Sequence, residues 1–245
     1  MTRTWALAGL ILLATTPHPL AQASCVSQTA QNPITLNEER VVLVHDGHDF
    51  EIEWSEQISG VWVNQYLVTQ NTNDDSCPHL SFFPDGSTAV VWREDGAQGQ
   101  IKYRARNLGN GAPAWQAAAI SVSGGVSNAS VPWAVVHDGT PWVAWHEATA
   151  SGIQLMGGGG DYPTPWPTRF ISDLIAIPNS TVTLALTIES ESGHLWVTWI
   201  DSASAIGYSE WSSETEAWEP AGSEPYANPA DIPAARQRVR DAILE

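Results

Sequence analysis

The feature of this sequence that most constrains its fold is a two-strand pattern that occurs four times. In each copy, alternating apolar residues lead to a short turn containing Asp-Gly or Ser-Gly, and a second apolar strand ends in tryptophan. A glycine between two β-rich runs supplies the positive φ angle of a tight hairpin. The pattern therefore predicts four β-hairpins, at residues 41–56, 79–94, 131–147 and 184–201.

Further strand signals follow each hairpin. The tryptophans that end the hairpins are Trp54, Trp92, Trp145 and Trp199, so the last two steps span 53 and 54 residues and the first only 38. A fourth strand is predicted near a later tryptophan in every copy except the first, which accounts for the short first step. A third strand is predicted in all four copies, at residues 61–63, 101–103, 153–155 and 206–208.

Four short antiparallel strands that recur about every 50 residues are typical of a β-propeller blade. One blade cannot bury its apolar faces alone, so the blades must stack on one another. We expect an all-β chain: a β-propeller of about four blades, each a four-stranded antiparallel repeat, at residues 24–228. A short amphipathic helix should follow at residues 229–245, with Asp231 as its cap, Val239 on its apolar side and its arginines packed on an acidic exterior.

The first 23 residues have the pattern of a Sec-type signal peptide. Arg3 gives a positive start, residues 6–14 form an apolar run, and residues 21–23 provide a small-x-small cleavage site. The run is too short to span a bilayer. We therefore expect removal of residues 1–23 and a secreted or periplasmic protein without a membrane span.

Cys25 and Cys77 are the only cysteines. In an oxidising compartment, an even pair predicts one disulfide, which would tie the mature N-terminus to the body of the domain. Two unpaired thiols are the alternative. A lipoprotein anchored through Cys25 is a further alternative, but Gln22 stands where a lipobox has leucine.

The chain is strongly acidic. Its 245 residues contain 10 Lys and Arg against 27 Asp and Glu, and loss of Arg3 with the leader would leave nine against 27, a net charge of −18. Nucleic acids and anionic lipid surfaces are bound largely through Lys and Arg. We therefore expect no nucleic-acid partner.

The order of the repeat motifs resembles a known superfamily. Asp-Gly, a strand ending Val-x-Trp-x-acid, Ile-x-Tyr and a later tryptophan are similar to the BNR-type, sialidase-like β-propellers, over roughly residues 40–222. The family's Asp-box, Ser-x-Asp-x-Gly-x-Thr-Trp, survives only in part at residues 108–115, 159–166 and 211–218. The resemblance implies the propeller architecture and leaves activity open, because this fold serves hydrolases, lectins and binding modules.

A sialidase-like active site, as the resemblance implies it, needs three arginines that clamp the substrate carboxylate, a Tyr-Glu nucleophile pair and an acid-base Asp. Three arginines of this chain, Arg93, Arg104 and Arg106, crowd into one blade. The family's catalytic domains also have six blades. We therefore expect a non-catalytic member, with a sialidase-like glycoside hydrolase that uses a carboxylate pair as the alternative.

Two loops offer metal-ligating side chains. Residues 45–49 (HDGHD) contain two histidines, but His137 repeats the His-Asp-Gly order, which favours a turn residue of the blade over a metal ligand. Residues 71–76 (NTNDDS) cluster oxygen donors that suit calcium, without the DxDxDG spacing. We expect no metal site and no cofactor, with calcium as the alternative.

A carboxylate follows each hairpin tryptophan by two positions. Residues two apart on a strand share a face, so each acid should lie at a strand end, on the side that packs against the neighbouring blade. One interpretation is that the carboxylates accept backbone N–H groups and order their loops. The four acids are Glu56, Glu94, Glu147 and Asp201.

The other interpretation is a ring of between-blade pockets, each with an indole wall from Trp92, Trp145 or Trp199 and a carboxylate at its rim, which suits a sugar or a cation. Our first hypothesis is a secreted, non-catalytic propeller that binds a glycan or an extracellular protein on the face that carries these acids. The second is a hydrolase that uses the same face, and the third is a structural assembly module.

Four blades with an incomplete first blade leave two arrangements open. One is a small propeller latched by the N-terminal segment, and the other is an open propeller that a second copy completes as a homo-oligomer. An exposed blade edge favours association, which is the reason for the second arrangement.

Overall fold

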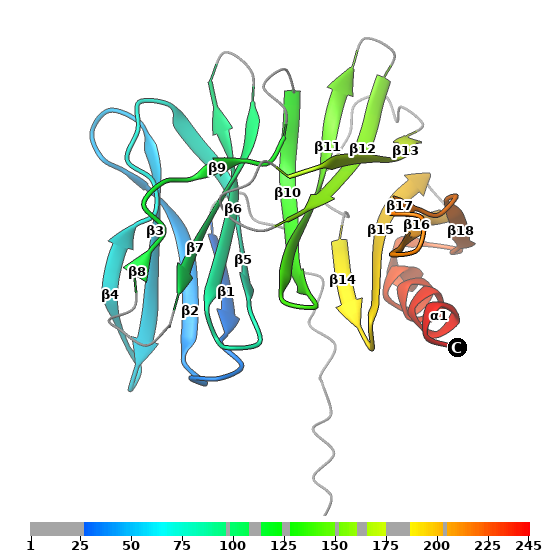
Figure 1. Ribbon diagram of the computed structural model, residues 1–245, viewed down its shortest axis with the longest axis horizontal. Coiled ribbons are helices and arrows are strands. Elements are labelled where there is room, and N and C mark those ends of the chain that lie inside the picture. The colour runs from blue at the N-terminus through cyan, green and yellow to red at the C-terminus, as the bar shows by residue number, and fades with distance from the viewer. Residues whose placement is uncertain are drawn as a thin grey trace, which may run out of the picture.

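The computed structural model describes residues 27–96, 99–107, 114–123, 128–149, 152–160, 166–174, 187–202 and 205–245. Within these residues the chain forms four antiparallel sheets, which follow one another in chain order, and a C-terminal α-helix (Figure 1). The predicted all-β fold of about four blades with a short helix is therefore confirmed.

The first sheet has the order β1-β2-β3-β4, with β1 at Ser27–Gln31, β2 at Glu38–His45, β3 at Phe50–Ile58 and β4 at Val61–Leu67. The second has β5 at Asp74–Phe82, β6 at Thr88–Asp95, β7 at Gln100–Asn107, β8 at Ala114–Trp115 and β9 at Ile120–Ser121. The third has β10 at Asn128–His137, β11 at Thr140–Thr149, β12 at Gly152–Gly159 and β13 at Thr168–Leu174. The fourth has β14 at Thr187–Glu191, β15 at His194–Ser202, β16 at Ala205–Ser212, β17 at Ala217–Trp218 and β18 at Gly222–Pro225.

All four predicted hairpins are present, and their turns have the predicted chemistry. Between β10 and β11, Asp138 and Gly139 have φ angles of 48° and 76°; between β14 and β15, Ser192 and Gly193 have 53° and 84°. Positive φ at both central residues matches the right-handed twist of the flanking strands. The Asp-Gly and Ser-Gly pairs thus set the register of their hairpins.

The first sheet differs from the prediction in one respect. It does not lack a fourth strand, because β1 precedes the predicted hairpin and pairs with β2. β1 has the sequence SQTAQ, which carries no apolar alternation and so gave no strand signal. The hairpin β2–β3 therefore forms the second and third strands of its sheet, whereas the other hairpins form the first and second.

The innermost strand of each sheet contacts the innermost strand of the next. β1 lies beside β5, β5 beside β10, and β10 beside β14. These strands run in the same direction: Asn32, just after β1, donates from Nδ2 to the carbonyl of Gly86 in the β5–β6 turn at 2.8 Å, and His137 at the end of β10 meets Ser190 of β14 at 2.8 Å. Consequently β3 ends at the opposite end of the molecule from β6, β11 and β15.

Buried tryptophans fill the spaces between the sheets. Trp92 packs with Ile52 and Trp54 of the first sheet, Trp145 with residues of the second, and Trp199 with residues of the third. Each of these three indoles is at most 1% exposed. Burial of one such side chain stabilises the fold by about 4–6 kcal/mol as an upper value. The repeat of tryptophan in the sequence is thus a repeat of contacts between sheets.

Helix α1, Ile232–Leu244, covers the face of the fourth sheet that points away from the third (Figure 1). Ala235 and Ile232 pack against Ile206 of β16 and Tyr226. Asp231 stands at the predicted cap position, as the last residue of a 3-10 turn at Pro229–Asp231, but its side chain makes no capping hydrogen bond to the helix.

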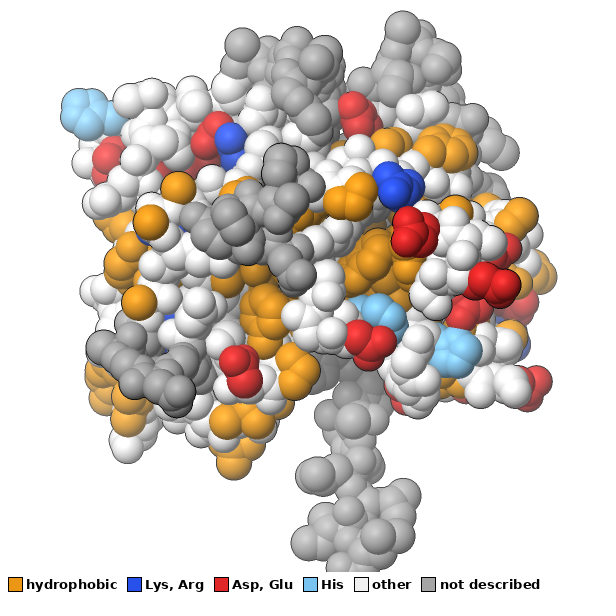
Figure 2. Space-filling model, viewed as in Figure 1, with side chains coloured by type: hydrophobic (Ala, Val, Ile, Leu, Met, Phe, Trp, Pro, Cys, Tyr) orange, Lys and Arg blue, Asp and Glu red, His pale blue; other side chains and the backbone are white. Residues whose placement is uncertain are grey.

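The arginines of α1 contact acidic residues of the fourth sheet, as predicted. Arg238 pairs with Glu224 of β18, and Arg240 with Glu191 of β14. The face of the molecule in Figure 2 carries many acidic and few basic side chains, in line with a net charge of −17.

The sheets spread along the long axis of the molecule, from the first sheet at one end to α1 at the other (Figure 1). Within the described part of the chain, no strand of the first sheet makes extensive contact with the fourth. β1 is an inner strand of the first sheet rather than a latch onto the fourth.

The predicted leader, residues 1–23, and Cys25 lie outside the described residues, so the leader and the disulfide stay predictions. No helix among the described residues has the length and apolar character needed to cross a membrane.

Candidate functional site

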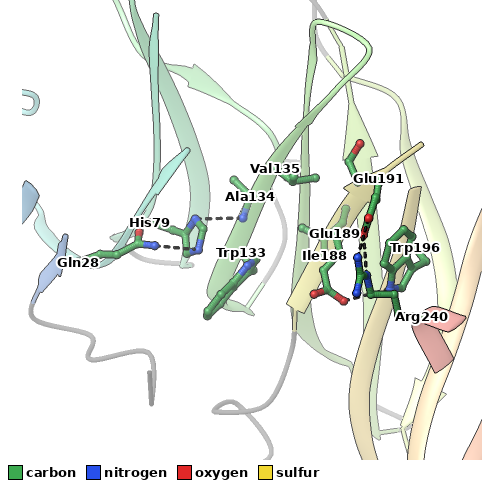
Figure 3. Close-up of a pocket in the computed structure, with 11 residues that line it drawn as sticks. Gln28, His79, Trp133, Ala134, Val135, Ile188, Glu189, Glu191, Trp196 and Arg240 are labelled. Atoms are coloured by element: carbon green, nitrogen blue, oxygen red, sulfur yellow. Dashed lines mark hydrogen bonds and ion pairs between the residues drawn. The ribbon is translucent and has the colours of Figure 1, made fainter. Parts of the chain in front are cut away.

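A pocket of about 380 Å³ lies where the innermost strands meet. We call it the central pocket. Strands of all four sheets and α1 contribute to it (Figure 3). The side chains that define its two walls are Gln28, His79 and Trp133 on one side and Glu189, Glu191 and Arg240 on the other.

The first wall is an indole held by a buried histidine. The ring of Trp133 lies 4.3 Å from the ring of His79, centroid to centroid. Burial lowers the pKa of His79 to about 3, so this imidazole is neutral at physiological pH. Its Nδ1 accepts the backbone N–H of Ala134 at 3.3 Å, and its Nε2 lies 3.3 Å from Nε2 of Gln28. These contacts join β1, β5 and β10.

Trp133 owes its position to an irregularity in β10. The pairing of β10 with β11 shifts register between Ser130 and Trp133. A bulge of this kind changes the direction in which the next side chain points. Trp133 is partly buried, in contrast to Trp145 of the same hairpin, which is fully buried.

The second wall is a network of charged groups. Nε and Nη2 of Arg240 donate to the two carboxylate oxygens of Glu191, each at 2.6 Å. These hydrogen bonds hold the pKa of Glu191 below its usual value. Trp196 Nε1 donates to Glu189 Oε2 at 3.0 Å. A planar guanidinium and two carboxylates therefore face the indole of Trp133 across the pocket (Figure 3).

This arrangement offers groups that can bind a polar ligand. An aromatic face, hydrogen-bond acceptors and a guanidinium fork can orient a polar ligand. A general acid needs a raised pKa, whereas Arg240 lowers that of Glu191. Arg240 is also the only arginine among the described residues that line the pocket, so a three-arginine clamp is not assembled there.

Three of the four predicted acids, Glu56, Glu94 and Glu147, have described side chains, and none of these three lines the central pocket. Glu56 is the clearest correction. It lies at the opposite end of the molecule from Glu94, because β1 shifts the first hairpin outward by one strand. Glu56 is buried opposite Glu39 and accepts a hydrogen bond from Asn64.

The other three acids lie at the predicted strand ends. Glu94 is opposite Asp75 and has Oε1 3.3 Å from Nζ of Lys102. Glu147 is partly buried and lies opposite Gln154 in β12. Asp201 lies in β15, and its side chain is outside the described part of the structure.

The predicted indole walls are closed off from solvent. Trp92, Trp145 and Trp199 are buried between sheets, and their Nε1 atoms have no hydrogen-bond partner. The structure thus supports sheet packing as their role and offers no exposed ring for a ligand. The partly exposed indole near a carboxylate network is Trp133 instead.

Comparison of the sequence with protein-family models and with curated proteins finds no match. Solved structures nevertheless share the fold. A Trypanosoma rangeli sialidase in complex with the inhibitor DANA matches with a TM-score of 0.52 and 9% identity, over 79% of this chain and 37% of the sialidase.

A Penicillium chrysogenum α-L-arabinanase complexed with arabinobiose matches with a TM-score of 0.57 and 12% identity, over 84% of this chain and 68% of the arabinanase. AofleA from Arthrobotrys oligospora matches with a TM-score of 0.53 and 12% identity, over 82% of this chain and 57% of AofleA. At such identities the likeness is one of fold, and the fold is a sialidase-like β-propeller fold.

Proposed function

We propose that this chain is a non-catalytic binding module that recognises a glycan in the central pocket. The observation that carries the proposal is the partly buried indole of Trp133, which faces the Arg240–Glu191 pair across a pocket of about 380 Å³. A volume of this size falls in the range of small-molecule sites.

The chemistry of the two walls fits a sugar. A pyranose or furanose ring has an apolar face that packs on an indole, and its hydroxyl groups donate to carboxylates and accept from a guanidinium. The arabinanase of similar fold was complexed with arabinobiose, a disaccharide. By analogy, short glycans are the first ligands to test with this chain.

The test begins with the purified protein on a glycan array, followed by calorimetric titration of any glycan that binds. We expect Trp133→Ala to weaken binding at least tenfold, since aromatic contacts of this kind contribute roughly 1–3 kcal/mol. Trp62→Ala is the matched control, because Trp62 is also partly buried but lies in β4 under the guanidinium of Arg40. Equal binding by the wild type and Trp133→Ala would contradict the proposal, as would a silent array.

Hydrolysis is the alternative, and it predicts a different result. A hydrolase would release products from the bound glycan and lose turnover, but not binding, in Glu94→Gln or Glu147→Gln. We expect no product release by the wild type over hours at enzyme concentrations well above those used for glycosidases. Product release that depends on Glu94 or Glu147 would contradict the non-catalytic proposal and would show that the protein is a hydrolase.

We also propose that the protein is exported and carries a Cys25–Cys77 disulfide. Cys77 lies in β5, and β1, which begins two residues after Cys25, lies beside that strand. Gln28 of β1 accepts the backbone N–H of Leu80 in β5. The mass of protein collected from outside the cytoplasm tests both points. Export predicts the loss of residues 1–23, and the disulfide predicts a gain of two hydrogen atoms when the protein is reduced.

A further inference from the structure

The two loops with metal-ligating side chains, predicted separately from the sequence, meet in one place. Asp46, Asp49 and Glu51 belong to the turn between β2 and β3 and the start of β3, and their ligand atoms lie within 4.8 Å of one another. Residues 71–76 precede and begin β5. This acidic cluster is at the boundary of the first and second sheets, away from the central pocket.

Two hydrogen bonds hold the second loop against the first, and a third lies within the second loop. The backbone N–H of Asn71 donates to Glu51 Oε1 at 2.8 Å, and the backbone N–H of Phe50 donates to Asp74 Oδ1 at 3.0 Å. The side chain of Asn71 also donates to Asp75 Oδ2 at 3.2 Å. These bonds use one oxygen of each acid and leave the other oxygens of Glu51 and Asp75 for a further partner.

The remaining oxygens are buried and have no hydrogen-bond partner. Asp49 is 6% exposed, and Glu51 and Asp75 are 1% exposed. The atoms in question are both carboxylate oxygens of Asp49, Oε2 of Glu51 and Oδ1 of Asp75. Buried carboxylates of native proteins are almost always paired or bound to a metal, because an unpaired one is strongly disfavoured.

Within the described ranges, no lysine or arginine side chain compensates the charge of the acidic cluster. Among the described residues, no Lys or Arg forms an ion pair with Asp46, Asp49, Glu51 or Asp75. The cluster thus has the charge and the open oxygens of a cation site.

The donor atoms indicate which cation fits. The clustered ligands are carboxylates, and His45 is engaged elsewhere: its Nδ1 accepts the N–H of Gly47 at 3.1 Å, and its ring contacts Phe50. A set of oxygen donors from flexible loops suits Ca²⁺, whereas Zn²⁺ favours histidine and cysteine.

We propose that Asp46, Asp49 and Glu51, with Asp75 beside them, bind one Ca²⁺ that ties the β2–β3 turn to the start of β5. Oδ1 of Asp46 accepts the N–H groups of His48 and Asp49, which presets the turn and leaves Oδ2 for the ion. Water completes the coordination shell. The site acts as a clamp between two blades, and it is independent of glycan binding in the central pocket.

The test is thermal unfolding and calorimetric titration of the whole protein, first freed of metal with a chelator and then given CaCl₂ alone. We expect one Ca²⁺ per chain and a rise in Tm of roughly 5–10 °C when free Ca²⁺ is 100 times its Kd. The same concentration of MgCl₂ should give a smaller shift, because Mg²⁺ demands octahedral geometry and gives up water reluctantly.

The double variant Asp49→Asn, Glu51→Gln should weaken Ca²⁺ binding, with a Kd at least a hundredfold higher than that of the wild type. This variant removes repulsion between buried carboxylates, so its metal-free form should melt higher than the metal-free wild type. Asp138→Asn is the matched control, because Asp138 occupies the same His-Asp-Gly turn in the third sheet with a side chain that is 81% exposed. It should bind Ca²⁺ like the wild type.

Two results would overturn the proposal. One is a wild type whose Tm and heat of titration do not respond to millimolar Ca²⁺. The other is a Ca²⁺ response that the double variant keeps in full. The wild-type titration decides the matter even if the double variant does not fold.

Discussion

Arg240 of helix α1 and Glu191 of β14 form a two-point ion pair, with both donor–acceptor distances at 2.6 Å. The pair joins residues 49 positions apart and closes one wall of the central pocket. Its side chains are 37% and 39% exposed. The ion pair thus connects α1 to β14, the inner strand of the fourth sheet, and places the guanidinium of Arg240 at the wall of the central pocket.

Replacing Arg240 by Ala should have a small effect on stability and a larger one on binding. Because the pair is partly solvated, we expect the free energy of unfolding in urea to fall by about 1 kcal/mol or less. Glycan affinity should fall at least fivefold, since the guanidinium fork is lost. A double-mutant cycle with Glu191→Gln measures the coupling, and no change in affinity would contradict a role for Arg240 in the pocket.

Replacing Gly207 by Ala should destabilise the fourth sheet. Gly207 pairs with Trp199 across β15 and β16, and a Cβ atom at position 207 would overlap the indole. Overpacking of this kind costs about 1–3 kcal/mol. Gly96→Ala is the control, because its Cβ would meet Asn73 only at ordinary contact distance. Equal midpoints in denaturant for the two variants would show that Trp199 is free to move.

Much of the fold follows from local pattern. The Asp-Gly and Ser-Gly turns and the alternating strands predict the hairpins β2–β3, β5–β6, β10–β11 and β14–β15, because both signals depend on residues close in sequence. β1 escaped prediction because the pairing of SQTAQ with β2 comes from tertiary contacts and not from its own composition. Because β1 is the innermost strand of the first sheet, Glu56 lies at the opposite end of the molecule from the end that was predicted for it.

The central pocket could not be predicted in the same way. Its walls come from Gln28, His79, Trp133, Glu191 and Arg240, which lie in five elements and meet only when the sheets stack. In the hairpin at residues 131–147 the sequence pattern pointed to Trp145 and Glu147, whereas the partly exposed indole that lines the pocket is Trp133. The presence of Trp133 at the start of that hairpin could be read from the sequence. The bulge in β10 that directs its side chain could not.

His146 should make stability depend on pH. Both of its ring nitrogens are buried without a hydrogen-bond partner, and burial lowers its pKa from 6.5 to about 4. Between these values the unfolded chain binds the proton and the folded one does not, so the free energy of unfolding falls as pH drops from 6.5 towards 4.

The contribution of this ring is up to about 1.4 kcal/mol per pH unit in that window. His146→Leu should remove it, which chemical denaturation at several pH values measures. An unchanged pH slope in the variant would show that His146 is protonated in the folded protein.

Helix α1 should keep the protein monomeric. It covers the face of the fourth sheet on which a further blade would stack, with Val239 2% exposed. We expect Val239→Asp to detach the helix and to cause association through the uncovered sheet. Light scattering with size exclusion at micromolar concentration checks both proteins. A dimeric wild type would contradict this expectation and would favour the arrangement in which a second copy completes an open propeller.

The most direct test of glycan recognition follows the indole N–H signals of the tryptophans by ¹⁵N NMR during titration with a glycan that binds. The Trp133→Ala variant assigns the signal of Trp133. We predict that this signal shifts and saturates with the ligand, while those of the buried Trp92, Trp145 and Trp199 stay in place. Saturable binding that leaves the Trp133 signal unmoved would contradict the account.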